Sequence, residues 1–208
     1  MKKKHVIWLV LLIIFLIIML GILFNKTTSI DNYVYNLVAS NITNNKTTFF
    51  KVITFFGSTK FIVTLCAIFL LLFLLLKNKW IGINICLALI TSTLVNNIVK
   101  IIIRRPRPEV TKLVIEHSYS FPSGHTMAAT MMYGMLMYYV LNSKLNKYLK
   151  LLICILLGSL VILVGISRIY LGAHYFTDVI AGIVLSSLLL LVIIDFINKK
   201  DFKRFFVK

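Results

Sequence analysis

Long apolar runs separated by short polar stretches are the feature that most constrains the fold of this chain. The run at residues 6–24 contains no charged residue, and five further apolar stretches follow it along the 208 residues. An apolar helix needs about 20 residues to cross the hydrocarbon core of a bilayer, where all backbone polar groups must be hydrogen-bonded internally. Hydrophobic residues make up 60% of the sequence, which is too many for an ordinary soluble domain. The pattern predicts an all-α, polytopic membrane protein.

Six membrane-spanning helices are expected, at residues 6–24, 61–76, 80–103, 122–141, 151–166 and 175–197. They occupy most of the chain, so we expect a single integral-membrane domain over residues 1–208. The first run is longer than a signal-peptide core and precedes no small-residue cleavage site, which predicts that it is retained. In the polar segment after it, residues 30–38 suit either a short helix on the membrane surface or an ordinary connector.

The net charge of +17 comes from 23 basic and 6 acidic side chains. In a soluble protein such a charge would suggest nucleic acid, but here many basic residues flank apolar runs, where they anchor helices at the membrane surface. We therefore expect a phospholipid bilayer as a partner, and no nucleic acid. Six spans bring both termini and the loops at Lys77 and Lys144 to one side, and the positive-inside rule predicts that this side is cytoplasmic.

Residues 100–107 contain a basic cluster that does not follow this rule. The cluster ends the third span, on the side opposite to the termini, where membrane anchoring explains it poorly. Two further patterns reach the same outer face: Pro122-Ser123-Gly124-His125, which opens the fourth span, and residues 167–178, which join the fifth span to the sixth. Each pattern alone also has a structural explanation, as an anchor, a helix start or a helical pair. Their occurrence at one face predicts a single functional site.

The cationic and amide groups of these patterns suit a phosphate. Lys100, Arg107 and Arg168 provide one point charge and two planar donor forks that match phosphate oxygens. Ser123 and Gly124 lie at an expected helix N-terminus, where free amides and the helix dipole favour an anion.

Two histidines complete the expected site. His174 and Asp178 are four residues apart, so on one helix they share a face and the carboxylate can orient the ring. His125 is a second group for proton transfer. Two histidines and an aspartate would also suit a metal ion, but three fixed cations in the same pocket oppose a divalent ion. We therefore predict a site with no metal and no cofactor.

The three patterns together resemble the signature of the type 2 phosphatidic acid phosphatase superfamily, which includes membrane lipid phosphatases, glucose-6-phosphatase and the vanadium haloperoxidases. The resemblance covers residues 100–178, without departure at a signature position. It implies that His174 attacks phosphorus to form a phosphohistidine, that Asp178 orients His174, and that His125 protonates the leaving oxygen and later helps to activate water. It also implies that the other signature residues bind the phosphate oxygens: Lys100, Arg107, Ser123, Gly124 and Arg168.

Five charged or titratable residues near the signature fall outside it. Arg104 and Arg105 either attract a second phosphate or lipid headgroup, or simply anchor the third span. Glu109, Glu116 and His117 are interpreted as solvated loop residues rather than catalysts.

The expected function is that of a lipid phosphatase, which removes the terminal phosphate from a membrane lipid phosphate or diphosphate at the outer face of the cytoplasmic membrane. Undecaprenyl diphosphate is favoured, because an outer-face site suits the recycling of a cell-wall carrier lipid. Phosphatidylglycerol phosphate and phosphatidic acid are the alternatives. Phosphotransfer to an acceptor other than water, vanadate-dependent oxidation and non-catalytic phospholipid binding or transport stay open, as does the oligomeric state.

Overall fold

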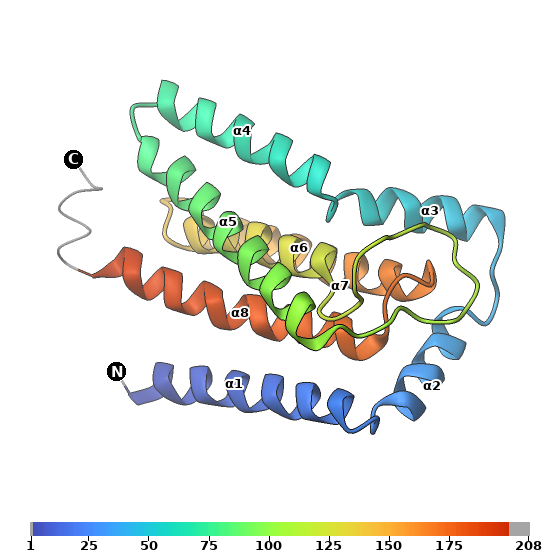
Figure 1. Ribbon diagram of the computed structural model, residues 1–208. Coiled ribbons are helices and arrows are strands. Elements are labelled where there is room, and N and C mark those ends of the chain that lie inside the picture. The colour runs from blue at the N-terminus through green and yellow to red at the C-terminus, as the bar shows by residue number, and fades with distance from the viewer. Residues whose placement is uncertain (1, 200–208) are drawn as a thin grey trace.

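The structure, a computed structural model, describes residues 2–199, with side chains from residue 5 onward. Over this range the chain forms eight helices and no strand, which confirms the all-α prediction (Figure 1). A basic tail is expected from the sequence at residues 199–208, and its residues 200–208 lie outside the described range. The helices are α1 (Lys2–Leu23), α2 (Thr28–Val38), α3 (Asn44–Phe55), α4 (Thr59–Leu75), α5 (Lys79–Ile103), α6 (Gly124–Leu141), α7 (Lys147–Tyr170) and α8 (Phe176–Asn198).

Each expected span corresponds to one helix, but composition identifies fewer crossings than six. By length and hydropathy, α1, α5, α7 and α8 can each cross a membrane, and the bent pair α3–α4 is a fifth candidate. α6 also contains His, Thr and Tyr among its methionines, so it is less apolar than its neighbours. The structure therefore supports a polytopic membrane protein with four or five recognisable spans. A sixth crossing by α6 stays a prediction.

The polar segment after α1 contains two helices instead of a plain connector. α2 corresponds to the short helix considered at residues 30–38, whereas α3 was not predicted. α3 packs against α7 and bends by 40° into α4. Gly57 lets this bend lie close to α6 and α7, because a Cβ there would lie 2.6 Å from Val164 Cγ1 and 2.9 Å from the His125 carbonyl oxygen.

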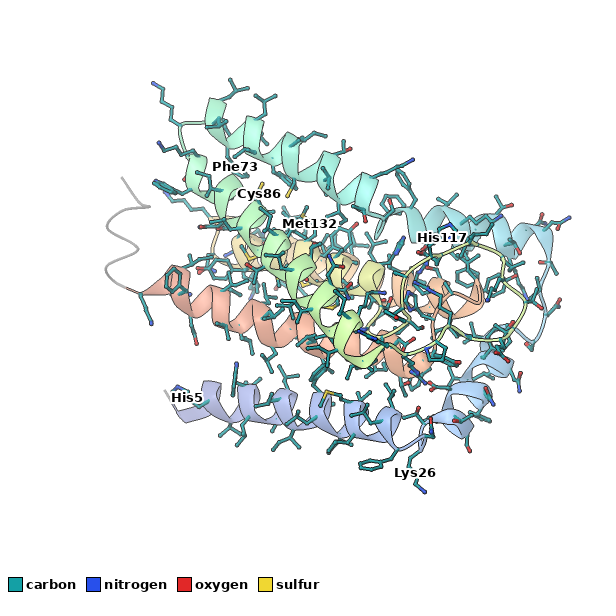
Figure 2. All side chains as sticks on the ribbon, in the orientation of Figure 1. His5, Lys26, Phe73, Cys86, His117 and Met132 are labelled. Carbon is teal, nitrogen blue, oxygen red and sulfur yellow. The ribbon has the colours of Figure 1, made fainter. Side chains whose placement is uncertain are left out.

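α6 lies at the centre of the bundle, in contact with α4, α5, α7 and α8 (Figure 1). Its buried face is rich in methionine, whose flexible thioether fills irregular gaps; Met132, labelled in Figure 2, is fully buried. α1 packs outside this core against α8. Leucine and isoleucine side chains on the outer faces of α1, α4 and α5 are largely exposed, as contact with lipid requires.

The two ends of the bundle contain different chain segments. The beginning of α1, the end of α8 and the α4–α5 and α6–α7 turns lie at one end (Figure 1). The C-terminal ends of α5 and α7 and the N-terminal ends of α6 and α8 lie at the other end. All three sequence patterns therefore meet at the end of the bundle opposite to the first and last described residues.

The loop between α5 and α6 closes this second end. α5 stops at Arg104, which has a left-handed backbone (φ 50°), and Pro106 cannot continue the helix. Farther along, the Leu113 N–H donates to the Leu171 carbonyl at 3.1 Å. Gly172, with φ +67°, makes this docking possible, because a Cβ there would lie 2.4 Å from the Thr111 carbonyl oxygen. The loop is thereby fixed against the α7–α8 turn.

Candidate active site

A polar cavity of about 220 Å³ lies where the three sequence patterns meet. Its wall includes five of the eight predicted site residues: Lys100, Arg107, Gly124, His125 and His174. They come from the end of α5, the following loop, the start of α6 and the α7–α8 turn. The patterns therefore converge on one cavity, with both histidines on its wall.

His174 and Asp178 meet in a different way from the one expected. α8 begins at Phe176, so His174 precedes the helix and Asp178 is its third residue. The Asp178 Oδ2 accepts a hydrogen bond from the Tyr175 N–H at 3.1 Å and lies 3.5 Å from His174 Nδ1. The carboxylate thus caps α8 and contacts the ring from the helix N-terminus. The expected pair is present, but the expected placement of both residues on one helix is wrong.

The contacts of the His174 ring assign its tautomer. Nε2 lies 3.3 Å from Arg107 Nη1, and because a guanidinium can only donate, Nε2 must accept. Nδ1 therefore carries the proton, and it faces Asp178. Burial lowers the pKa of His174 to about 4, against the opposing effect of the hydrogen bond to Asp178. At neutral pH the ring is uncharged and has a lone pair on Nε2, as a nucleophile requires.

Asp178 is fully buried and is held by several donors. Its Oδ2 also accepts from the Ser120 hydroxyl, and its Oδ1 accepts from Arg105 Nη1 at 2.6 Å. Sequence reasoning missed Ser120, whose only signal is its position two residues before the Pro-Ser-Gly-His pattern. These bonds satisfy a carboxylate that would otherwise be strongly destabilised by burial.

The cations at the cavity are fixed by neutral acceptors. Lys100 is buried, and its Nζ donates to the Tyr119 carbonyl and, at 3.3 Å, to Ser118 Oγ. Arg107 donates from Nε to the Ser118 carbonyl and from Nη1 to the Ala173 carbonyl, each at 2.7 Å. Carbonyl oxygens fix the positions of both side chains without cancelling their charge. The cavity can therefore attract an anion.

Arg168 lies behind the cavity wall and forms an ion pair with Glu116. Its Nη1 donates to Thr54 Oγ1 of α3 at 2.8 Å, and its Nη2 contacts Glu116 Oε1. The other Glu116 oxygen lies 3.9 Å from Arg107 Nη2, and Glu116 lines the cavity. The interpretation of Glu116 as a solvated loop residue is therefore wrong. Its carboxylate occupies the space between two arginines where a phosphate is expected.

The structure also shows where the two other loop residues and Ser123 lie relative to their predicted places. Glu109 and His117 are exposed, as expected; Figure 2 labels His117 in the loop. Ser123 is fully buried, and its Oγ lies 2.9 Å from Thr126 Oγ1 rather than on the cavity wall. Its N–H donates to the Asp178 carbonyl at 3.1 Å, which links the start of α6 to α8.

Arg105 has two carboxylate partners that neither sequence-based explanation included. Its side chain is only 10% exposed, and its guanidinium contacts Asp178 and Asp31 at 2.6 Å each. Arg104 differs, because it is exposed and donates from Nε to the Ile101 carbonyl at 3.0 Å. Sequence reasoning had no local signal for a partner in α2.

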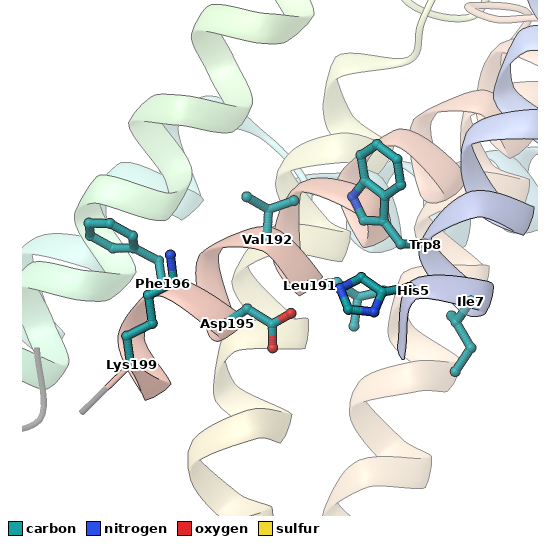
Figure 3. A pocket seen from close by; sticks show the side chains of 8 residues that line it. All are labelled: His5, Ile7, Trp8, Leu191, Val192, Asp195, Phe196 and Lys199. Atoms are coloured by element: carbon teal, nitrogen blue, oxygen red, sulfur yellow. The ribbon is translucent and has the colours of Figure 1, made fainter. Parts of the chain in front are cut away.

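Two further cavities lie elsewhere in the bundle, and one of them adjoins the polar cavity. An apolar groove of about 400 Å³ lies between α4 and α5, and Thr59 and Thr93 line both this groove and the polar cavity. The polar cavity is therefore contiguous with an apolar groove on the side of the bundle. A larger cavity of about 480 Å³ lies between α1 and α8, near His5 and Asp195 (Figure 3). It contains no signature residue.

Comparisons with known proteins agree with this geometry. The family profile described as the PAP2 superfamily matches residues 81–202. The chain is 37% identical over 155 residues to phosphatidylglycerophosphatase B of Bacillus subtilis (strain 168), covering 74% of this chain and 75% of the relative. Its fold is similar to the crystal structure of a transmembrane PAP2 type phosphatidylglycerolphosphate phosphatase from Bacillus subtilis, with a TM-score of 0.85, 31% identity and coverage of 93% and 98%. Aquifex aeolicus LpxE shares the fold, with a TM-score of 0.65, 24% identity and coverage of 78% and 93%.

The Glu116 contact predicts that Glu116→Gln binds phosphate-like anions several-fold more tightly than the wild type. The substitution removes the negative charge that competes for Arg168 and Arg107. Inhibition by orthovanadate measures this affinity. Glu109→Gln is the matched control, because it removes the same charge from an exposed position of the loop. Equal or weaker inhibition of Glu116→Gln would contradict the prediction.

The environment of His174 predicts an unusually low acid limb in the pH profile of kcat/KM. Since its pKa is lowered to about 4, the ring stays neutral, and phosphate release continues, well below the ordinary pKa of histidine. The rate should fall only as the pH drops through about 4. The profile is measured with a lipid phosphate and corrected for the second ionisation of the phosphate at about pH 6. A remaining enzyme limb near pH 6.5 would contradict this assignment.

Proposed function

The chain belongs to the PAP2 superfamily and is a membrane lipid phosphatase, and from this premise we propose that it removes the terminal phosphate from phosphatidylglycerol phosphate. The observation that carries the proposal is a cavity with two histidines and fixed cations that adjoins an apolar groove. The names of the two Bacillus subtilis proteins support this substrate. Undecaprenyl diphosphate, which we favoured from sequence, stays a prediction.

In the first proposed step, His174 Nε2 attacks the phosphorus atom. As the Nε2–P bond forms, the bond between phosphorus and the lipid oxygen breaks, and protonated His125 gives its proton to that oxygen. The ring of His174 becomes positively charged. The Asp178 carboxylate, 3.5 Å from Nδ1, supports this charge and holds the ring orientation.

In the second step, water attacks the phosphohistidine. His125, now neutral, takes a proton from the water while the Nε2–P bond breaks. Inorganic phosphate leaves, His174 returns to its neutral form and His125 is protonated again. Both histidines lie on the wall of one cavity, which supports this division of roles.

The proposed phosphate ligands lie around the same cavity. Lys100 and Arg107 stabilise the charge on the transferring group, and the start of α6 at Gly124 adds backbone amides. Arg168 joins them when the phosphate displaces Glu116. Ser123 contributes in a different way, because its buried hydroxyl is bonded to Thr126 and its backbone amide fixes the start of α6.

The apolar groove gives the lipid tail a place. Its walls carry aliphatic side chains of α4 and α5, such as Ile62 and Leu89, and it meets the cavity at Thr59 and Thr93. An amphiphile can thus keep its chain among these helices while its headgroup reaches the cations. This arrangement favours lipid substrates over short water-soluble phosphates.

Release of inorganic phosphate from a lipid panel tests the proposed function. We expect the purified protein to hydrolyse phosphatidylglycerol phosphate faster than phosphatidic acid or undecaprenyl diphosphate, in the presence of a chelator. His174→Ala should reduce the rate by at least about 10³-fold, because the nucleophile is lost. The matched control is His117→Ala, which removes an exposed histidine of the loop and should keep the wild-type rate.

Each measurement in this panel has a result that would contradict one part of the proposal. Full function without His174 would favour a binding or transport role, and loss of turnover on chelation, restored by a divalent metal, would contradict metal independence. Faster hydrolysis of undecaprenyl diphosphate would replace the proposed substrate. Equal turnover of a short water-soluble phosphate would contradict the role of the groove. Oxidation of halide with vanadate and peroxide, or transfer to an alcohol, would change the reaction class.

We also propose that the active site faces the outside of the cytoplasmic membrane, with both termini in the cytoplasm. Basic residues in the α4–α5 and α6–α7 turns, at the opposite end, support this orientation. In a protein without its native cysteines, a membrane-impermeant maleimide should label Lys112→Cys in intact cells and Asn146→Cys only after lysis. Both positions are exposed. The reverse labelling pattern would invert the topology.

A further inference from the structure

We propose that Asp31 and Arg105 are positioning residues for the phosphatase reaction, which hold Asp178 and through it set the orientation of His174. Asp31 lies in α2, outside the three sequence patterns, and Arg105 lies in the loop after α5, within residues 100–107 but not at a signature position. The inference rests on the proposed roles of His174 and Asp178. It adds a buried layer behind that pair.

One guanidinium joins the two carboxylates. Arg105 Nη1 donates to Asp178 Oδ1 at 2.6 Å and to Thr177 Oγ1 at 2.8 Å. Its Nη2 donates to Asp31 Oδ2 at 2.6 Å and to Thr27 Oγ1 at 3.2 Å. Since the guanidinium is planar and rigid, these four bonds fix the direction from which it reaches Asp178.

Asp31 holds the same turn of α8 from the other side. It is 1% exposed, and its Oδ1 accepts from both the backbone N–H and the Oγ1 of Thr177, each at 2.9 Å. Thr177 is the residue immediately before Asp178. A carboxylate at this helix N-terminus is favoured by the free amides and by the helix dipole. Asp31 therefore fixes the backbone that carries the Asp178 side chain.

The charges of this cluster balance when His174 becomes positive. Asp31 and Asp178 contribute two negative charges and Arg105 one positive charge, so the three together carry one net negative charge. A buried cluster with an uncompensated charge is unfavourable, and a positive ring at His174 Nδ1 removes that excess. Arg105 thus keeps Asp178 ionised, while Asp31 prevents Arg105 from neutralising it completely.

Two more contacts fix Arg105 in place. Its guanidinium carbon lies 3.9 Å from the centre of the Tyr175 ring, and its backbone carbonyl accepts from the Ser120 N–H at 2.9 Å. Ser120 in turn donates its hydroxyl to Asp178. Arg104, the preceding residue, is exposed and bonds to the end of its own helix. The two adjacent arginines therefore form a matched pair for mutation.

Steady-state kinetics of Arg105→Gln, Asp31→Asn, the double variant and Arg104→Gln test the inference. The first two should lower kcat by about 10- to 100-fold with little change in KM, because neither residue lines the cavity and each holds the reacting geometry. The double variant should lose no more than Arg105→Gln, because both substitutions break one linked unit. Arg104→Gln should match the wild type.

The acid limb of kcat/KM separates positioning from simple packing. In Arg105→Gln, Asp178 has no cation beside it and stabilises protonated His174 more strongly. The pKa of His174 should therefore rise, and the limb should move to higher pH. In Asp31→Asn, Arg105 acts on Asp178 alone, so the limb should move to lower pH. The other groups around His174 are the same in both variants: Lys100, Arg107, Glu116, His125 and Arg168. Loss of packing gives no such opposite shifts.

Orthovanadate inhibition and thermal unfolding in detergent report whether the cavity and the fold are intact, and inhibition should stay close to that of the wild type. If Arg105→Gln does not fold, Arg105→Lys takes its place in the test. This variant keeps the charge without the planar fork, so it should fold and still have a lower kcat than the wild type. If the wild type is active and Arg105→Gln has the same kcat, the positioning role is overturned while the proposed function stands. A loss of kcat matched by an equal loss of vanadate affinity, without opposite pH shifts, would overturn it in the same way. A wild type without turnover would overturn the proposed function, and this inference with it.

Discussion

The burial of ionised side chains at one end of an apolar helix bundle is the constraint on which the rest of the structure depends. Asp178 and Arg168 are almost completely inaccessible, and each buried charge costs several kcal/mol unless it is paired or hydrogen-bonded. For Arg168 the partners are Thr54 of α3 and Glu116 of the α5–α6 loop. For Asp178 they are Arg105 and Ser120 of the same loop and the Tyr175 N–H at the start of α8. The need to satisfy the charges therefore explains why the α5–α6 loop and α3 are held against the end of α7 and the start of α8.

The charges are compensated unequally, and this inequality gives the cavity its chemistry. Asp178 is paired with Arg105, whereas Lys100 and Arg107 are held mainly by carbonyl oxygens that leave their charge available. The result is a positive cavity wall beside a neutral imidazole whose proton faces a carboxylate. This wall attracts a phosphate, and in the proposed mechanism His174 Nε2, which accepts from Arg107 in this structure, is the nucleophile. A bundle with all cations paired to carboxylates would bind anions weakly.

Sequence predicted six of the eight described helices and five residues of the cavity wall because both leave local signals. Apolar runs identify spans, and the order of the three patterns along alternating spans places them at one end. The spacing of His174 and Asp178 was ambiguous, because four residues separate partners within a helix and also across its N-terminal cap. The contacts of Glu116, Ser120 and the Asp31–Arg105 pair could not be predicted, since their partners lie far away in sequence; 146 residues separate Asp31 from Thr177.

The polar segment between α1 and α4 shows why such contacts matter. In sequence it was an ambiguous connector, yet Thr54 holds Arg168, and Asp31 holds Thr177 and Arg105. Thr59, the first residue of α4 after this segment, lines both the cavity and the groove. The segment's polar residues satisfy the buried ends of α7 and α8, which the apolar spans cannot do. The segment is therefore part of the site's framework: α2 and α3 provide acceptors that keep the buried arginines in place while the cavity binds and releases an anion.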